Sequence, residues 1–286
     1  MQSSTRFLWF LSVMFLLAGC GQTYVVDGPP TEPLRVERLD PEDAVPRVEP
    51  RSKYGNPPSY VVFGKRYYTM TSSDGFVERG VASWYGKKFH GRRTSSGETY
   101  DMYAMTAAHK ALPLPTYARV THLGNGKSIV VRINDRGPFH RNRVIDLSYA
   151  AATRLDMVRA GTALVEVRAI DPRRTEVQAR GPSDGPPASA GAPVRQAREI
   201  SIYLQVGAFA SLANAERFRA SLAGVAEHTP AKIAEAQRGG QTLYRVRLGP
   251  LRDVNAADTL SNRLSSAGID EAVVVLDEAL SVPRSY

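Results

Sequence analysis

The sequence predicts a β-rich closed barrel over residues 76–170, followed by a smaller α+β unit over 201–280. Three observations predict this arrangement. Short runs of alternating apolar and polar residues, bounded by glycine, proline and Asn-Gly turns, fill the first segment. A repeated strand–turn–helix pattern fills the second segment. Proline-dense stretches precede and separate the two units, since eight of the 19 prolines lie in 21–60 and five in 171–200.

The first 20 residues are typical of an export signal. Residues 7–17 are apolar apart from Ser12, which is too short for a membrane span of roughly 20 residues but fits a secretory signal core of about 7–15 residues. The only cysteine of the chain, Cys20, ends this stretch. A single cysteine excludes an intrachain disulfide framework and a cysteine-rich zinc site. We therefore expect 1–19 to be a signal peptide.

Two further segments lack the apolar periodicity of a folded unit. Residues 20–75 are proline-rich and predict an extended tether, although the Tyr- and Val-rich stretch 60–75 has a composition suited to docking on the barrel. Residues 171–200 combine Pro, Ala, Gly and charged residues, which predicts a disordered linker. The predicted order is therefore signal, tether, barrel, linker and α+β unit.

The barrel is predicted from several short strands and one helix. The strand-like runs are 77–84, 117–122, 127–133, 143–147 and 164–170. Asn125-Gly126 predicts a hairpin turn, and Ser148 is the expected N-cap of a helix over 149–155. So many short strands in about 95 residues favour a small closed barrel.

The second unit contains an internal repeat, because residues 203–222 match 245–264 at an offset of 42. Each copy starts as an alternating strand, turns at a glycine and continues as an amphipathic helix. A strand-like segment follows each helix, which gives a βαββαβ order. This order predicts a ferredoxin-like or RNP-like four-stranded antiparallel sheet with both helices on one face. The other face is then free to bind an extended ligand.

The formal net charge of +9 indicates an anionic partner. Lys and Arg number 15 against 7 Asp and Glu in 76–170, but 8 against 9 in 200–280. The excess positive charge is therefore concentrated in the barrel. An exported chain makes nucleic acid an unsuitable partner, which leaves cell-wall polymer or a membrane surface.

The densest polar cluster also lies in the barrel segment. Glu98 and Asp101 lie in Gly-Glu-Thr-Tyr-Asp, His109 in Thr-Ala-Ala-His-Lys and Asp135 in Asn-Asp-Arg-Gly-Pro. Asp135 directly follows an apolar strand, so a rigid element would hold it at the barrel rim. If the other two carboxylates lie nearby, like-charge repulsion raises one pKa and keeps a proton available for a glycosidic oxygen.

Purely structural roles are the alternative for the same residues. Asp135 would then only cap a turn, Glu98 would be a solvated loop charge, and His109 would be a half-buried histidine bonded to a carboxylate or carbonyl. The histidines have no spacing typical of a metal site. We therefore expect neither a metal nor another cofactor.

The barrel segment closely resembles the rare lipoprotein A family of septal-ring peptidoglycan lytic transglycosylases. The resemblance depends on SWYG, TAAHK-LP, VRINDRGPF and IDLS-AA, and it covers nearly all of 76–170. It implies a six-stranded double-psi β-barrel, the fold of expansins and some endoglucanases. The C-terminal unit resembles SPOR domains, which bind glycan strands stripped of stem peptides, through LQVGAF at 204–209 and YRVRLGP at 244–250.

The sequence Leu-Ala-Gly-Cys at 17–20 resembles the lipobox of bacterial lipoproteins. This resemblance implies that Cys20 carries the lipid and becomes the first residue. Gly21, in place of aspartate, implies the outer rather than the inner membrane. We therefore expect a protein anchored on the periplasmic face of the outer membrane and enriched at the division septum, where divisome proteins are candidate partners.

The family resemblance also implies a mechanism. Asp135 would protonate the oxygen of the MurNAc–GlcNAc β-1,4 bond and then accept the proton of the MurNAc C6 hydroxyl as it attacks C1, which leaves a 1,6-anhydro end. One carboxyl suffices because the nucleophile belongs to the substrate. Glu98 would stabilise the developing positive charge or tune Asp135, while Asp101 and His109 would complete the polar network. Trp84 would stack on a sugar ring or pack in the barrel.

In the C-terminal unit the resemblance places Gln205, Phe209 and Arg247 in a glycan groove. Arg247 would pair with the lactyl carboxylate of a peptide-stripped MurNAc. The structural alternatives are a core contact for Phe209 and a solvated charge for Arg247. For the whole chain the alternatives are a non-catalytic peptidoglycan-binding lipoprotein and a hydrolytic glycosidase, whose inverting form needs carboxylates roughly 6.5–9.5 Å apart.

Overall fold

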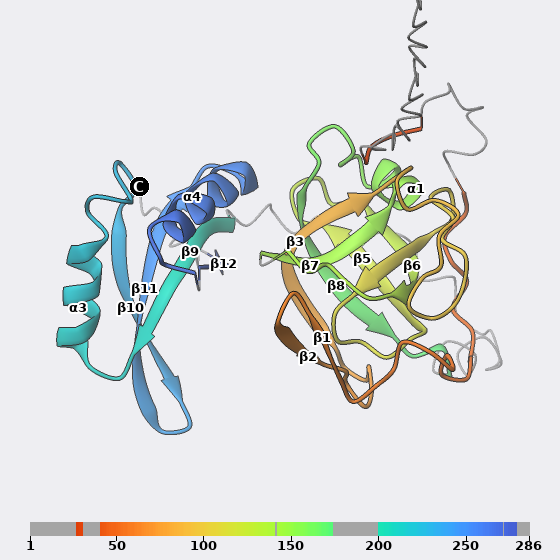
Figure 1. The fold of residues 1–286 in the computed structure, drawn as a ribbon, viewed down its shortest axis with the longest axis horizontal. Coiled ribbons are helices and arrows are strands. Elements are labelled where there is room, and N and C mark those ends of the chain that lie inside the picture. The colour runs from red at the N-terminus through yellow and green to blue at the C-terminus, as the bar shows by residue number, and fades with distance from the viewer. Residues whose placement is uncertain (1–26, 31–40, 141, 174–199, 271, 279–286) are drawn as a thin grey trace, which may run out of the picture.

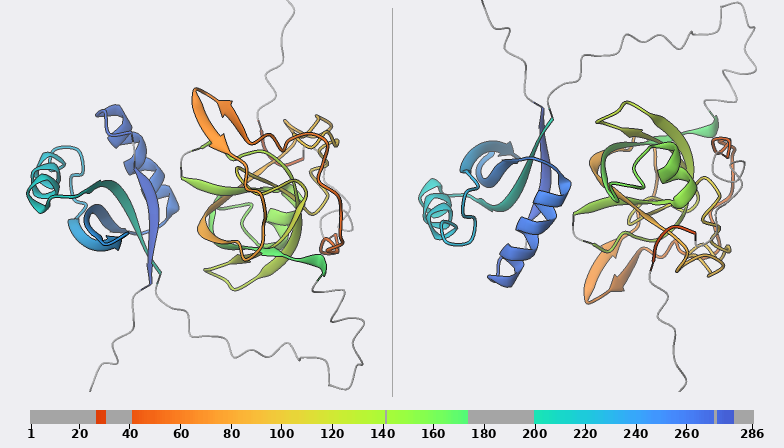
Figure 2. Two further views of the ribbon diagram at one scale, coloured as in Figure 1. Left: turned by 90° about the horizontal axis from the view of Figure 1, so that it is seen from below. Right: turned by 90° about the horizontal axis from the view of Figure 1, so that it is seen from above.

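The computed structural model describes residues 27–30, 41–140, 142–173, 200–270 and 272–278 of the chain. The predicted signal peptide, Cys20 and most of the predicted linker lie outside these residues. Within them, a barrel and a smaller unit of one sheet and two helices lie side by side (Figures 1 and 2). No helix in the described ranges is both long and apolar enough to cross a membrane.

The first unit is a closed barrel with the strand order β3-β7-β4-β6-β5-β8. Its strands are β3 (Val77–Tyr85), β4 (Thr106–His109), β5 (Thr116–His122), β6 (Ser128–Asp135), β7 (Arg143–Ser148) and β8 (Ala163–Ile170). The β3–β7 and β4–β6 pairs are parallel and the other four pairs are antiparallel. The predicted six-stranded barrel is confirmed.

Alternation along the strands fills the barrel interior. Ile129, Val131 and Ile133 of β6 are buried in one cluster with Ile145 and Leu147 of β7. The residues between them point to the outer face of the barrel. Helix α1 (Tyr149–Arg154) closes one side of the barrel.

The N-cap of α1 was predicted correctly. The Ser148 side chain accepts a hydrogen bond from Ala151 N at 3.1 Å and donates to Ala104 O at 2.6 Å. The cap therefore joins α1 to the loop that precedes β4.

The second unit has the sheet order β10-β11-β9-β12, with all pairs antiparallel. Its elements are β9 (Ile200–Phe209), α3 (Leu212–Ser221), β10 (Ala231–Arg238), β11 (Gln241–Leu251), α4 (Val254–Ser266) and β12 (Val273–Glu278). Leu204 and Leu248 of the sheet are buried together with Leu260 and Leu264 of α4. The predicted βαββαβ order is confirmed.

Residues 41–75, which we assigned to an extended tether, run along the barrel surface, and we call them the strap. Ala44 N donates to Val130 O at 3.1 Å, and Met70 N donates to Ala111 O at 2.7 Å. Strands β1 (Ser59–Val62) and β2 (Lys65–Tyr68) form a hairpin within it. The sequence predicted docking for 60–75 only; it did not predict the path of 41–59, because hydrogen bonds to the barrel leave no periodicity in the sequence.

A second, shorter contact lies further towards the N-terminus, at residues 27–30. The Asp27 side chain accepts hydrogen bonds from Gly86 N at 3.1 Å and Lys88 N at 3.2 Å. Gly28 O accepts from Lys87 N at 3.0 Å. The loop that follows β3 therefore binds this short piece of chain through three backbone N–H groups.

Candidate functional site

Asp135 is the last residue of β6, and the two oxygens of its carboxylate have different surroundings. Oδ1 accepts hydrogen bonds from Ser95 N at 2.8 Å, Ser95 Oγ at 2.7 Å and Arg136 N at 2.7 Å. No described residue donates a hydrogen bond to Oδ2. The carboxylate is therefore held through one oxygen, and the other can exchange a proton with a ligand.

The side chain of Arg136 fixes the backbone around Asp135. Its guanidinium donates to Gly55 O at 2.8 Å, Leu112 O at 2.5 Å and Asn56 Oδ1 at 3.2 Å. Burial lowers the pKa of Arg136. Because its donors are used on the strap and on the loop after β4, Arg136 serves the structure of the site rather than the ligand.

Glu98 lies in the same turn as Ser95 but binds the neighbouring side chains of β6. It accepts two hydrogen bonds from Arg132 Nη1, at 2.9 and 2.8 Å, and one from Asn134 Nδ2 at 2.9 Å. A single turn thus binds Asp135 through Ser95 and the outer face of β6 through Glu98. Among the described residues no hydrogen bond joins Glu98 to Asp135.

Asp101 and His109 do not join this arrangement, which corrects the predicted shared polar network. Asp101 accepts from Tyr103 N at 3.0 Å and lies 3.6 Å from Nδ1 of His90. His109 is paired with Glu78, at 3.1 Å between Nε2 and Oε2. The network was predicted from proximity in sequence, whereas the barrel places the two residues at separate points.

His109 is held as a neutral imidazole. Its side chain is 4% exposed, and Nδ1 accepts hydrogen bonds from Ala111 N at 3.1 Å and Leu112 N at 3.0 Å. Nε2 must therefore carry the proton and donate it to Glu78. Burial lowers the pKa of His109, and the bond to Glu78 only partly opposes this effect. His109 thus orders the loop after β4.

The structure adds Asp146, which the sequence analysis did not select. Ala108 of β4 is the register partner of Asp135 on one side and of Asp146 on the other. Register partners point to the same face of a sheet, and two strand spacings amount to about 10 Å. A register shift between Ala107 and Ala108 on the β6 side makes Asp135, two residues after the core residue Ile133, a partner of Ala108, so the two aspartates lie on either side of Ala108.

Asp146 has a different environment from Asp135. Ser83 Oγ donates to its carboxylate, and Arg143 Nη1 donates to Ser83 Oγ at 2.9 Å. Burial raises the pKa of Asp146, although the hydrogen bond from Ser83 lowers it. The signal in the sequence was an acidic residue inside the apolar strand RVIDLS, but only the strand register shows what it faces.

Trp84 packs in the barrel instead of presenting a free ring. It lies against the hydrophobic core and makes an edge contact with Tyr149 at 5.5 Å between ring centroids. An aromatic group that the sequence analysis missed adjoins Arg136. Tyr60 and Tyr67 of the strap stack at 5.4 Å, and Phe139 packs edge-on against Tyr67 at 5.5 Å.

Gln205 and Arg247 are register partners on β9 and β11, on the face of the sheet opposite the helices. Arg247 Nη1 lies 3.4 Å from Asp277 Oδ2. Lys232 contacts the same carboxylate at 3.3 Å and lies over the Tyr203 ring at 3.8 Å. One acidic and two basic side chains thus meet beside the Tyr203 ring on this face.

Phe209 is on the opposite, helix-covered face, so its predicted place in a glycan groove is wrong. Its ring packs against Phe218 of α3 at 5.2 Å between centroids and against the hydrophobic core. Simple alternation puts 205 and 209 on the same face. A register shift between Val246 and Arg247 reverses the alternation, and no sequence pattern revealed it.

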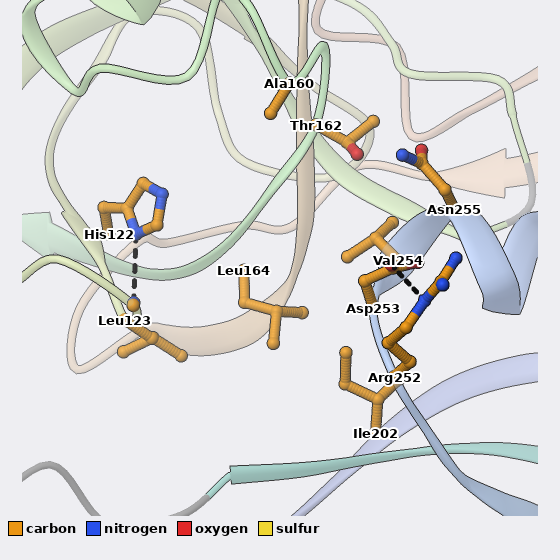
Figure 3. A pocket seen from close by; sticks show the side chains of 11 residues that line it. His122, Leu123, Ala160, Thr162, Leu164, Ile202, Arg252, Asp253, Val254 and Asn255 are labelled. Atoms are coloured by element: carbon orange, nitrogen blue, oxygen red, sulfur yellow. Dashed lines mark hydrogen bonds and ion pairs between the residues drawn. The ribbon is translucent and has the colours of Figure 1, made fainter.

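A cavity of about 540 Å³ lies where the two units meet (Figure 3). Leu123 and Leu164 line it from the barrel, and Ile202 and Val254 line it from the second unit. Its one carboxylate, Asp253, caps α4 by accepting from Ala256 N at 2.8 Å, and it also accepts a hydrogen bond from Arg252 Nε at 2.9 Å. This carboxylate is therefore held by hydrogen bonds from its own chain neighbours, and the other titratable side chains of the cavity are His122 and Arg252.

Comparisons with known proteins identify relatives of both units. A family model described as lytic transglycolase matches residues 77–167, and a SPOR domain model matches residues 200–275. The chain is 40% identical to an endolytic peptidoglycan transglycosylase RlpA of Pseudomonas aeruginosa, over 87% of this chain and 84% of the relative. It is 42% identical to the protein of that name from Vibrio cholerae, over 94% and 96%.

Among solved structures, the SPOR domain of the Pseudomonas aeruginosa RlpA is 36% identical to this chain, with a TM-score of 0.25. The match covers 26% of this chain and 96% of that domain.

Proposed function

The chain belongs to the family of endolytic peptidoglycan transglycosylases named RlpA, and on that premise we propose that it cleaves the MurNAc–GlcNAc β-1,4 bond of peptidoglycan and leaves 1,6-anhydro-MurNAc ends. The observation that carries the proposal is the asymmetric carboxyl group of Asp135. Three donors hold Oδ1, while Oδ2 has no donor among the described residues. This is the arrangement required of a group that must give and take one proton in place.

The reaction proceeds in two proton transfers. Asp135 gives its proton to the glycosidic oxygen as the bond from that oxygen to MurNAc C1 breaks. The C6 hydroxyl of the same MurNAc then attacks C1, and its proton passes to the Asp135 carboxylate. No water is consumed, and Asp135 ends as it began. The donors on Oδ1 stabilise the carboxylate formed between the two transfers, because hydrogen bonds to a charged acceptor are strong.

The two flanking carboxylates support this chemistry from different sides. Glu98 lies in the turn that binds Asp135 and is held there by Arg132 and Asn134. Its negative charge would stabilise the positive charge that develops on the sugar. Asp146 shares the row of Asp135 across Ala108. Its buried carboxyl, with a raised pKa, places a second titratable group along the same face.

We propose that the SPOR unit holds peptide-stripped glycan on the open face of its sheet. Gln205 and Arg247 lie there as register partners. The lactyl carboxylate of a stripped MurNAc would replace Asp277 as the partner of Arg247, because both are carboxylates. The contact of 3.4 Å between Arg247 and Asp277 is long for an ion pair, which favours the exchange.

The proposed location follows from the sequence alone. Cys20 in Leu-Ala-Gly-Cys would anchor the chain by a lipid on the periplasmic face of the outer membrane. The SPOR unit would concentrate it at the septum, beside divisome proteins, where it aids cell separation. A Cys20→Ser variant tests the anchor, since it should move the protein from the membrane fraction to the soluble fraction.

The central experiment is digestion of peptide-stripped sacculi followed by mass spectrometry of the released strands. Products one water lighter than hydrolytic fragments support the proposal, whereas reducing ends indicate a hydrolase. Binding without any release indicates the alternative function, a non-catalytic peptidoglycan-binding lipoprotein. The Asp135→Asn variant should bind glycan and release nothing; normal release would contradict the role of Asp135.

A further inference from the structure

We propose that Glu49 of the strap is a positioning residue for Glu98 and acts through the Arg132 guanidinium. The inference rests on the proposed function of the barrel site. Glu49 lies outside the barrel in sequence, 49 residues before Glu98 and 83 before Arg132. Nevertheless, the strap brings it to the outer face of β6, where Arg132 lies between the two glutamates.

The hydrogen bonds divide the guanidinium between these two carboxylates. Arg132 Nε donates to Glu49 Oε1 at 3.1 Å and Nη2 donates to Glu49 Oε2 at 2.8 Å. This is a two-bond, fork-like pair along one edge of the guanidinium. Nη1 is left for Glu98, whose two oxygens it contacts at 2.9 and 2.8 Å. Because Glu49 occupies Nε and Nη2 of Arg132, only Nη1 is left to bind Glu98.

Burial of Arg132 and Glu49 makes the loss of either hydrogen-bond partner costly. The side chains of Arg132 and Glu49 are only 17% and 18% exposed, whereas that of Glu98 is 40% exposed. A guanidinium so covered needs a partner at each edge. The hydrogen bonds from Arg132, and then those from Tyr117 and Arg47, hold the pKa of Glu49 at about 2. Glu49 is thus ionised at neutral pH and binds one edge of Arg132.

Removal of the charge on Glu49 changes what Glu98 does. A glutamine has a single acceptor oxygen, so either Nε or Nη2 of Arg132 would lose its acceptor, and the other carboxylate bound to this guanidinium is Glu98. Arg132 would then rotate to form the two-bond pair with Glu98 and draw it away from Asn134 Nδ2, now at 2.9 Å. Glu98 would be both displaced and more fully neutralised, so its charge would stabilise the transition state less.

The first test compares Glu49→Gln with Glu42→Gln, a matched change at an exposed glutamate of the same strap. Turnover of peptide-stripped glycan is followed by release of 1,6-anhydro-ended strands. For Glu49→Gln we expect kcat to fall about tenfold or more, with KM within twofold, when each variant is assayed well below its thermal midpoint. Glu42→Gln should match the wild type. Equal turnover by both variants overturns the proposal.

A double-mutant cycle separates positioning from simple stability. In a Glu98→Gln background, Glu49→Gln should cause no further loss, because the residue that it positions is already gone. Losses that multiply overturn the proposal. Glu49→Asp, which keeps the charge, should recover part of kcat. If kcat follows the thermal midpoint across these variants, Glu49 has a structural role only and the proposal fails.

The wild type serves as the check on the proposed function. If it releases no 1,6-anhydro ends, both the proposed function and the role of Glu49 fail. If it releases them and Glu49→Gln does so at the same rate, only the role of Glu49 fails.

Discussion

The two oxygens of Asp135 are the clearest case of a residue whose role depends on its neighbours. Asp135 was predicted from its place after an apolar strand, and the structure puts it at the end of β6. The sequence could not show that Ser95 supplies two of the three donors to Oδ1. Ser95 lies 40 residues away, and only the folded turn brings it to Asp135.

Ser95→Ala should slow the reaction without abolishing it. The hydroxyl bond of 2.7 Å to Asp135 is lost, while the two backbone N–H donors stay. A hydrogen bond to a charged group contributes roughly 1.5–3 kcal/mol, so we expect about a 10- to 100-fold lower kcat. Ser96→Ala is the control, because the hydroxyl of Ser96 contacts Thr94. An effect of the same size in both variants would assign the loss to the turn rather than to Asp135.

Asp146→Asn should separate activity from stability. Burial raises the pKa of Asp146. Ionisation of Asp146 therefore lowers the free energy of unfolding as pH rises above the normal pKa of an aspartate. A neutral Asn should leave the free energy of unfolding at pH 7 unchanged or higher. Turnover should nevertheless fall, by roughly tenfold, because a carboxyl group on the same face as Asp135 is lost. Asp156→Asn, at an exposed carboxylate, should change neither quantity; unchanged turnover in Asp146→Asn would show that its place beside Asp135 is incidental.

His109 should make barrel stability depend on pH. Burial lowers its pKa, so the unfolded chain binds a proton more readily than the folded one. Its contribution is complete above the unfolded pKa of about 6.5 and is lost as pH falls below it, by up to about 1.4 kcal/mol per pH unit. Urea unfolding between pH 5 and 7.5, followed by the fluorescence of Trp84, measures this slope. His109→Gln should flatten it; an equal slope in the variant would assign the pH dependence to other groups.

At the scale of elements, the sequence predicted the strands and helices that show their own pattern of apolar and polar residues. The run 127–133 became β6 at Ser128–Asp135, and the repeat at an offset of 42 became two strand–helix units. Strand β4 was missed, because its four residues show no alternation. Docking was predicted for 60–75, but not for 41–59, whose path is fixed by hydrogen bonds to the barrel and not by a pattern of its own. Hydrophobic periodicity does not reveal segments whose path depends on hydrogen bonds to distant parts of the chain.

Gly249→Ala should disable the SPOR unit alone. Gly249 has φ +139, and an added Cβ would lie 2.8 Å from Ile202 O and 2.7 Å from the Tyr203 ring. Alanine is strained at such a φ, by about 1–3 kcal/mol, and the backbone contact adds to this cost. We expect loss of binding to stripped sacculi, with cleavage of short soluble strands retained. Gly224→Ala, which meets nothing within 4 Å, should bind normally; normal binding by Gly249→Ala as well would contradict the strain argument.

Over the whole molecule, the charge is divided unevenly between the two units. Residues 76–170 have 15 basic and 7 acidic side chains, whereas 200–280 have 8 and 9. Attraction between a basic surface and an anionic glycan is screened by salt, with a Debye length of about 10 Å at 0.1 M. Binding through the SPOR sheet depends on a few placed groups and is affected less.

Salt should therefore weaken the two modes of binding to different extents. In the Gly249→Ala chain, where the barrel is the remaining contact, association with glycan should fall steeply between about 0.05 and 0.5 M NaCl. The wild type should retain most of its binding over this range. Co-sedimentation with stripped sacculi measures both, and parallel curves would show that the barrel charge does not contribute to recognition.

With the proposed lipid anchor, the contacts of Asp27 and the strap with the barrel would limit the distance of the barrel from the membrane. With Cys20 as the proposed anchor, a free tether of 56 residues up to Phe76 would let the barrel range over roughly 190 Å. Because Asp27 is bound at Gly86 and Lys88, only the seven residues from 20 to 27 remain, and they span about 25 Å at most. If Cys20 carries the lipid, we therefore expect the enzyme to act on glycan in the layer next to the lipid surface, and to reach strands deeper in the wall only after that contact is released.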